Sequence, residues 1–405
     1  MHTVPSADSS PPRGSWRWDD FVLDAARYEL RRGDTVIKVE PQVFDVLMAL
    51  VSHHDRLLTK EELLDSVWGG RFVGEAALTS RIKAARRALG DDGESQRYIR
   101  TVRGRGYQFI GHLRDAVERA DPPPEMPAQH IAFCQAGDGV RLAYAVTGSG
   151  PPLVRAANWM THLGYDIESP VWCHWVRDLS VRHTFVRYDE RGCGLSDWHA
   201  HDFTFEDWVT DLESVVEAVG LQRFPLLGVS QGGAVAVAYA ARHPDRVSRL
   251  VLNGAYARGR AVRATTEDEQ RAAALDLELA RVGWGRSDPA FRQVFAAQFL
   301  PDGTRADWEA FDQLQRRTTS AQNAVRFLEV FAHIDVRDLA GQVRCPTLVL
   351  HSRDDHRVPL RYGEELASLI ADAELIALPS NNHLLTSREP AWRTFCDEVE
   401  GFLAV

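Results

Sequence analysis

The sequence predicts two domains: a small α+β unit, then a larger α/β domain with a mostly parallel sheet and a helical cap. A Pro-rich stretch, ERADPPPEMPAQH at 118–130, is typical of an extended linker, because a Pro triplet fits neither a helix nor a central strand. Before it, short strand-like pieces precede three helical patterns, whereas after it apolar runs alternate with long amphipathic segments. We therefore expect a disordered tail at 1–15, a first domain at 16–114, a linker at 115–130 and a second domain at 131–405.

The composition is that of an ordinary folded protein. Hydrophobic residues make up 44% and charged residues 26% of the 405 residues, which excludes a chain disordered throughout. No apolar run approaches the roughly 20 residues that a membrane span needs, and the polar tail has no signal-peptide core. The five scattered cysteines favour reduced thiols. These features predict a cytoplasmic protein without a membrane partner.

The net charge of −10 is unevenly distributed along the chain. Between Arg71 and Arg114, ten Arg and Lys residues stand against four Asp and Glu residues, so this segment carries +6 and the remainder carries −16. A short basic segment in an acidic protein indicates contact with nucleic acid. The acidic average therefore does not exclude a DNA-binding function.

The first domain contains strands, then three helices, then a hairpin. Residues 16–40 alternate in short strand-like pieces with a turn at Gly33–Asp34. Pro41 opens the first helix, a Thr59–Glu62 capping box opens the second, and the third runs from about Glu75 to Leu89. The sequence YIRTVRGRGYQFIG then predicts a hairpin with a basic tip.

The third helix combines a buried stripe with a polar face. Its apolar positions, at helical spacing, are Leu78, Ile82, Ala85 and Leu89. Its opposite face carries Thr79, Ser80, Lys83, Arg86 and Arg87. These side chains suit phosphates or guanine edges, and Arg103 and Arg105 lie at the tip of the neighbouring hairpin. We expect this unit to bind double-stranded DNA as a homodimer; the alternatives are a solvated surface helix and a protein-interaction module.

Residues 16–112 resemble the OmpR/PhoB-type winged-helix DNA-binding domain. The matching stretches are YELRRGDTVIKVEPQVFDVLMALV, LLTKEELLDSVWG, LTSRIKAARRALGD and YIRTVRGRGYQF. The resemblance implies a four-stranded N-terminal sheet, three helices and a C-terminal hairpin, with the third helix in the major groove. Such domains usually follow a phosphate-accepting receiver, whereas here the domain comes first, so we do not expect control by phosphorylation.

The pattern after residue 131 predicts an α/β domain with a parallel sheet. The strand candidates lie at 151–154, 184–189, 224–229, 249–253, 346–351 and 373–378. The third of them, 224–229, leads into the sequence GVSQG at 228–232, which comes directly before a helix of small residues. A G-x-S-x-G sequence between strand and helix is typical of a nucleophile elbow, a strained turn that raises Ser230 above the sheet.

A serine needs a base and an orienting acid before it acts as a nucleophile. Both follow in the chain: Asp355 comes after the strand CPTLVLH, and His383 comes after the strand AELIALPS. Asp354 is the alternative acid. The three residues predict a Ser230–Asp355–His383 catalytic triad.

Residues from about 131 to 403 resemble the α/β-hydrolase superfamily. The resemblance favours Asp355 over Asp354, because the sequence HSRDDHRVP matches the superfamily pattern HGxxDxxVP with Asp355 as its acid. It also implies that YDERGCGLSD at 188–197 forms a tight glycine turn in which Asp189 and Arg191 are structural.

The oxyanion hole departs from the superfamily pattern. Asn158 stands where the superfamily usually has a glycine, so the resemblance implies that the backbone N–H of Trp159 supplies one donor. The backbone N–H of Gln231, in the elbow, supplies the other. This departure leaves open whether the triad turns over or serves a ligand pocket.

Residues 255–340 lie between two strands and predict a helical cap over the triad. Its aromatic residues are Trp284, Phe291, Phe295, Phe299, Trp308, Phe311, Phe327 and Phe331. They either line an apolar pocket or form the core of the cap itself.

The two domains together predict a transcription regulator whose hydrolase-like domain senses, and in one version hydrolyses, a small apolar ester, lactone or related carbonyl compound. The alternative is a serine esterase or lactonase in which the winged helix serves autoregulation or tethering. We expect no metal and no organic cofactor, and a small molecule and DNA as partners.

Overall fold

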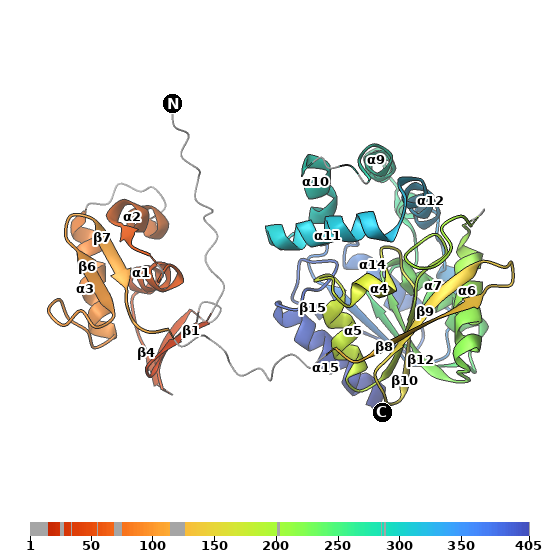
Figure 1. Ribbon diagram of the computed structural model, residues 1–405, viewed down its shortest axis with the longest axis horizontal. Coiled ribbons are helices and arrows are strands. Elements are labelled where there is room, and N and C mark those ends of the chain that lie inside the picture. The colour runs from red at the N-terminus through yellow and green to blue at the C-terminus, as the bar shows by residue number, and fades with distance from the viewer. Residues whose placement is uncertain are drawn as a thin grey trace. The chain divides into compact units, whose positions relative to one another are not determined.

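The structure is a computed structural model (Figure 1). It describes residues 15–113 and 126–404 except for 25–27, 34, 55, 69–74, 201–202, 285 and 287–288. Residues 1–14 of the predicted tail, residues 115–125 of the predicted linker, Asp34, Arg71 and Arg114 lie outside the described residues. The chain divides into two compact units between Pro123 and Pro124. No helix among the described residues combines the length and the hydrophobicity that a membrane crossing requires.

The first unit consists of two small antiparallel sheets and three helices. Its elements are β1 (Ser15–Trp18), β2 (Phe21–Asp24), β3 (Glu29–Arg32), β4 (Thr35–Ile37), α1 (Pro41–Ser52), β5 (Leu58–Thr59), α2 (Lys60–Trp68), α3 (Glu75–Ala88), β6 (Ile99–Val102) and β7 (Gly106–Phe109). Strands β1 to β4 form one sheet in chain order, and β5 pairs with β7 of the β6–β7 hairpin. This order confirms the predicted winged helix.

The core of the first unit holds α3 against the rest of the domain. The residues of the predicted apolar stripe are all buried, three of them on α3 and Leu89 directly after its end. The opposite face of α3 is left for polar side chains. The capping box predicted at the start of α2 is present, with Glu62 N donating to Thr59 Oγ1 at 3.1 Å and Thr59 N donating to Glu62 Oε2 at 2.7 Å. Burial of the apolar stripe fixes α3 within the unit.

The second unit is a large sheet covered by helices. Its strands are β8 (Gln129–Gln135), β9 (Arg141–Thr147), β10 (Pro152–Ala156), β11 (Thr184–Tyr188), β12 (Phe224–Val229), β13 (Val247–Asn253), β14 (Thr347–Ser352) and β15 (Ala373–Leu378). Its helices are α4 (Leu163–Asp166), α5 (Cys173–Ser180), α6 (Phe205–Val219), α7 (Gln231–Arg242), α8 (Arg260–Arg263), α9 (Glu267–Gly283), α10 (Pro289–Phe299), α11 (Arg305–Thr318), α12 (Ala321–Ala332), α13 (Arg337–Ala340), α14 (Arg361–Leu369) and α15 (Pro390–Ala404).

The sheet has the order β15-β14-β13-β12-β10-β11-β9-β8. Strands β10 to β15 run parallel, and they coincide within two residues with the six predicted strands. The antiparallel pair β8–β9, which closes one edge, was not among the predicted strands. One helical layer contains α6, α7, α13 and α14, which contact one another in that order. On α5 and α15, Trp175 packs against Trp392 and Phe395. The predicted α/β fold with a mostly parallel sheet is confirmed.

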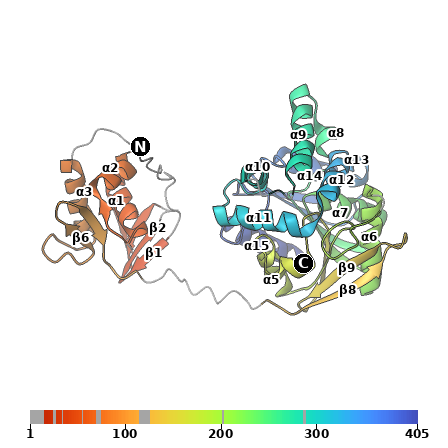
Figure 2. The ribbon, with the colours of Figure 1, turned by 45° about the horizontal axis from the view of Figure 1, so that its top comes forward.

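Helices α8 to α12 form the cap, between β13 and α13 in the chain, and Figures 1 and 2 show α9 to α12 gathered on one side of the sheet. The two ends of the cap are joined by backbone hydrogen bonds. Gly259 N donates to Ile334 O at 2.7 Å, and Val336 N donates to Ala257 O at 2.9 Å. The cap is therefore closed at its base by a short antiparallel bridge.

Candidate active site and nucleic-acid interface

Ser230 occupies the sharp turn between β12 and α7. Its backbone angles, φ 53° and ψ −123°, lie in a region that side chains other than glycine rarely adopt. The flanking glycine at 232 is required by space, since a Cβ there would lie 2.6 Å from Ala157 O. The turn therefore has the strained geometry of a nucleophile elbow.

The structure brings the three predicted triad residues together. His383 Nε2 lies 2.8 Å from Ser230 Oγ, and His383 Nδ1 lies 2.6 Å from Asp355 Oδ2. The other carboxylate oxygen of Asp355 accepts the backbone N–H groups of Arg357 at 2.8 Å and Val358 at 2.9 Å. An ionised Asp355 only accepts hydrogen bonds, so the ring proton of His383 sits on Nδ1 and Nε2 presents its lone pair to the serine hydroxyl.

Asp355 stays ionised in spite of its burial. Burial by itself raises the pKa of a carboxyl group, but His383 and the Val358 N–H hold the pKa of Asp355 below its usual value. Asp354, the alternative acid, is exposed, and its backbone N–H donates to Ser380 O at 3.1 Å. The geometry favours Asp355.

The expected oxyanion donors lie beside Ser230, with a buried hydrogen-bond chain behind them. The N–H of Trp159 donates to Gln231 Oε1 at 3.4 Å, a long bond, and Gln231 Nε2 donates to Glu190 Oε1 at 2.8 Å. Asn158, which stands in place of a glycine, donates from Nδ2 to Trp159 O at 3.0 Å and accepts from Arg155. No described residue accepts a hydrogen bond from the Gln231 backbone N–H.

Glu190 belongs to this run of hydrogen bonds. Sequence reasoning did not single it out, although it lies between Asp189 and Arg191, which were named there. Its carboxyl group is fully buried, which raises the pKa of Glu190 to about 8 from its ordinary value of 4.5. Between these pH values the folded protein keeps a proton that the unfolded chain has lost. The contribution of Glu190 to the free energy of unfolding therefore falls as the pH rises from about 4.5 to about 8.

We expect Glu190→Gln to remove this pH dependence, because glutamine does not titrate and still offers Oε1 to Gln231. The free energy of unfolding of the variant, relative to the wild type, should increase between pH 5 and pH 8 by up to a few kcal/mol. Denaturant unfolding at pH 5, 6.5 and 8 measures this, with Glu217→Gln on the surface of α6 as control. Parallel pH profiles for wild type and Glu190→Gln would contradict the assignment.

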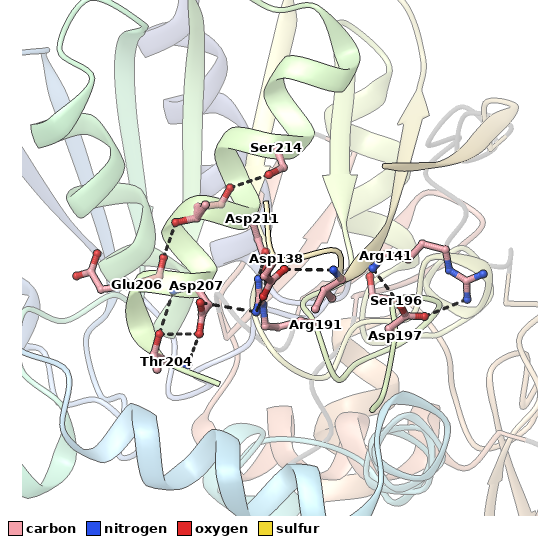
Figure 3. Close-up of polar contacts among 12 residues, drawn as sticks. Asp138, Arg141, Arg191, Ser196, Asp197, Thr204, Glu206, Asp207, Asp211 and Ser214 are labelled. Carbon is pink, nitrogen blue, oxygen red and sulfur yellow. Dashed lines mark hydrogen bonds and ion pairs between the residues drawn. The ribbon is translucent and has the colours of Figure 1, made fainter. Parts of the chain in front are cut away.

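The neighbouring turn at 188–197 is held by charged side chains. Asp189 Oδ2 accepts the backbone N–H of Leu195 at 2.8 Å. Arg191 donates to both carboxylate oxygens of Asp211 on α6, at 2.8 and 2.6 Å, and to Asp138 at 2.6 Å (Figure 3). Asp189 and Arg191 therefore have the structural role that the sequence predicts.

A pocket of about 540 Å³, including the space open to solvent at its mouth, lies between Ser230 and the cap. Of the eight cap aromatics, Phe299 and Phe331 line it. Trp284, Phe295, Phe311 and Phe327 are buried in the core cluster instead. The wall also carries Arg260, Arg263, Asp276 and Arg357. The expectation of an apolar pocket is thus wrong for one wall, because residues far apart in the sequence bring three guanidinium groups into it.

The polar face of α3 and the tip of the hairpin are exposed in the first unit. Five of the predicted DNA contacts are exposed: Ser80, Lys83 and Arg87 on α3, and Arg103 and Arg105 at the turn of the hairpin. The four basic side chains among them form no ion pair with any described residue. Thr79 is exposed too, and its hydroxyl donates to Glu75 O at 2.9 Å. These residues form a surface suited to phosphates and base edges.

Arg86 differs from the other predicted DNA contacts. Its Nη2 donates to Ile99 O at 2.7 Å and to Thr101 Oγ1 at 2.8 Å, and its Nε donates to Ile99 O at 3.3 Å. Nε and Nη2 of Arg86 are thus used within the unit and hold α3 against β6, and the role of Arg86 as a DNA contact stays a prediction.

The fold and the site define an α/β-hydrolase domain joined to a winged-helix domain. The chain belongs to the α/β-hydrolase fold family, whose model matches residues 163–389. The model of the C-terminal domain of transcriptional regulatory proteins matches residues 34–109, so the first unit is an OmpR/PhoB-type winged-helix DNA-binding domain.

Similar proteins match the two halves separately. The 2-hydroxy-6-oxo-2,4-heptadienoate hydrolase of Pseudomonas putida is 30% identical over 287 residues, which cover 66% of this chain and 90% of that protein. The transcriptional regulator HilA of Salmonella typhi is 36% identical over 113 residues, which cover 28% of this chain and 19% of HilA. The crystal structure of the esterase RhEst1 from Rhodococcus is 25% identical with a TM-score of 0.54, covering 68% of this chain and 98% of that one.

Proposed function

We propose that this chain is a DNA-binding transcription regulator whose second domain binds a small ester or lactone and hydrolyses it at Ser230. The observation that carries the proposal is the run of hydrogen bonds from Asp355 through His383 to Ser230, at the wall of a pocket. A hydrolase and an esterase among the similar proteins support the same reaction class.

The reaction is an acyl transfer in two halves. His383 Nε2 takes the proton of Ser230 Oγ while the oxygen bonds to the carbonyl carbon, and the carbonyl oxygen becomes an oxyanion. The N–H groups of Trp159 and Gln231 stabilise this oxyanion. His383 then returns the proton to the leaving alcohol. In the second half water attacks the acyl carbon and His383 takes its proton. His383 then passes this proton to Ser230 Oγ as the bond between that oxygen and the acyl carbon breaks, which releases the acid and regenerates the serine.

Regulation requires that the ligand bind the DNA-competent and DNA-incompetent conformations with different affinity. The test is binding of the full chain to its own upstream DNA, with and without a metabolite extract, and again after a fluorophosphonate has reacted with Ser230. A changed Kd for DNA in either case supports regulation by the pocket. An unchanged Kd in both supports the alternative, an esterase whose winged helix serves autoregulation or tethering.

The DNA-binding surface gives a second prediction. We expect the double variant Arg103→Ala/Arg105→Ala to bind this DNA about 10- to 100-fold more weakly at low salt, since each arginine contacts a phosphate from the hairpin tip. The slope of log Kd against log salt concentration should fall by about 2, because each lost phosphate contact lowers it by about 1. Fluorescence anisotropy over a salt series measures both quantities.

The matched control is Arg32→Ala/Lys38→Ala, which removes the same charge from β3 and the segment after β4. Arg32 pairs on the surface with Asp20, and such pairs contribute little to stability. The control should keep the salt slope of the wild type. Equal slopes for the wild type and the hairpin variant would rule out the hairpin as a DNA contact.

A further inference from the structure

Three guanidinium groups from distant parts of the second unit meet at the wall of the Ser230 pocket. Arg260 and Arg263 come from α8, the first helix of the cap, and Arg357 comes from the loop after β14, two residues beyond Asp355. Asp276, on α9, is the acidic residue that lines the same pocket. The lining therefore carries an excess of two positive charges.

The hydrogen bonds of these groups leave Arg263 without an acidic partner. Asp276 Oδ2 accepts from Arg260 and, at 2.6 Å, from Arg357 Nη1, which also donates to Gln298 Oε1 at 2.7 Å. Asp355 is engaged by His383 and by backbone N–H groups. No described carboxylate pairs with Arg263.

Arg263 is held in place by other means. Its Nη2 donates to Arg357 O at 3.3 Å, and its guanidinium lies 4.3 Å from the centre of the Tyr362 ring and 5.6 Å from that of Tyr256. Its Nη1 is buried with no hydrogen-bond partner among the described residues. An oriented, buried donor without an acceptor is costly in a folded protein, so a ligand acceptor would offset the cost.

The electrostatics of the cluster favour an anion. Burial, together with the neighbouring charges of Arg357 and Arg263, lowers the pKa of Arg260 to about 9. Burial likewise lowers the pKa of Arg357 to about 10. A negatively charged group among these side chains would relieve both the desolvation and the mutual repulsion.

We propose that the pocket selects a carbonyl compound that carries an anionic group, a carboxylate or a phosphate, which Arg263 and Arg260 bind while the ester or lactone carbonyl faces Ser230. The inference rests on the proposed function in that both use the same pocket. The apolar lining residues Leu277, Leu328, Phe299 and Phe331 hold the carbon chain between the two groups. The ligand is thus an acidic acyl compound rather than the uncharged apolar one expected from the sequence.

Three matched esters test the inference: mono-4-nitrophenyl glutarate, its uncharged methyl ester, and 4-nitrophenyl 4-(phosphonooxy)butanoate. Rates are corrected with Ser230→Ala as blank, because a neighbouring carboxylate speeds spontaneous hydrolysis. We expect kcat/KM to be about 10- to 100-fold higher for an anionic ester than for the methyl ester, which is typical of one or two hydrogen bonds to a charged group. The better of the two anionic esters identifies carboxylate or phosphate. Equal kcat/KM for all three would overturn the inference.

Substitutions assign the preference to the cluster. Arg263→Gln should reduce the ratio of anionic to uncharged kcat/KM to about one, whereas Arg263→Lys should retain part of it. The control Arg271→Gln removes an exposed arginine on α9 that pairs with Glu267, and it should keep the ratio unchanged. If Arg263→Gln does not fold, Arg260→Gln takes its place. A ratio unaltered in the folded variants of both arginines would contradict the inference.

Binding measurements separate this inference from the proposed hydrolysis. If no ester is turned over, the full chain with Ser230→Ala is titrated with glutarate and with inorganic phosphate by calorimetry. If Ser230→Ala binds glutarate or phosphate, and Ser230→Ala/Arg263→Gln binds the same anion at least tenfold more weakly, the anion site is supported even though the proposed reaction fails. Binding of neither anion overturns the anion site.

Discussion

Replacing Ser230 with alanine should lower ester hydrolysis by about a million-fold, the loss typical of removing the nucleophile of a catalytic triad. Without the hydroxyl, no acyl-enzyme forms. The backbone N–H groups of Trp159 and Gln231 then have no oxyanion to stabilise, because the oxyanion forms only when Ser230 attacks the carbonyl. Steady-state hydrolysis of 4-nitrophenyl butyrate and labelling by a fluorophosphonate both report the loss. The fold should be unchanged, because Ser230 contributes its hydroxyl to His383 and no buried apolar contact.

The same variant distinguishes binding from turnover as the regulatory event. If DNA binding by Ser230→Ala still responds to the metabolite extract, occupancy of the pocket is the signal. If the response is lost together with hydrolysis, the reaction itself is the signal. Ser214→Ala is a suitable control, since that hydroxyl donates to Thr210 O within α6. Hydrolysis that survives in Ser230→Ala would rule out Ser230 as the nucleophile.

Replacing Asp355 with asparagine should lower kcat by about ten-thousand-fold with little change in KM. Asp355 Oδ1 is fixed by two backbone N–H groups, so the asparagine oxygen takes that place and its NH₂ group faces His383. The ring then turns its lone pair to the asparagine and its proton to Ser230. In this tautomer His383 cannot accept the serine proton.

The neighbouring residue offers a control that differs by one position. Asp354→Asn makes the same chemical change on an exposed side chain that has no hydrogen bond to His383. Its kcat should equal that of the wild type. A large decrease of kcat in Asp354→Asn, with little decrease in Asp355→Asn, would make Asp354 the acid of the triad.

The fold could be predicted because its signals are local and repeated. The six parallel strands are short runs of mostly apolar residues, since helices cover both faces of the sheet, and such runs stand out in a sequence. The antiparallel strand β8 lacks this signal: it is an edge strand, and Phe133 in it is 52% exposed. Its mixed composition resembles that of a loop.

The triad could be predicted because motif and chain order fix its members. Ser230 lies in a five-residue motif, and Asp355 and His383 each follow a strand, so the parallel sheet carries all three to one edge. Arg86 and Arg87 show the opposite case. They are chemically identical neighbours on α3, and one is used within the domain only because the hairpin backbone lies beside it.

The arginine wall of the pocket could not be predicted from any pattern in the sequence. Arg260 and Arg263 lie in the cap, and Arg357 lies almost a hundred residues later, beside the acid of the triad. Their common location depends on the path of α8 over the sheet, and this path is set by tertiary packing. Aromatic residues in the cap were a visible signal, yet most of them pack among themselves.

The bridge that closes the base of the cap makes this segment a cassette. Its two ends are hydrogen-bonded to each other at Gly259 and Ile334, so a different helical insert could join the same two points without disturbing the sheet. Arg260, Arg263 and Asp276 would leave with the insert, whereas Ser230, His383 and Asp355 would stay. If the proposed function holds, exchanging the cap would change ligand preference while the triad stays, provided the new insert keeps an acceptor for the backbone N–H of His383, which here donates to Phe299 O at 2.9 Å.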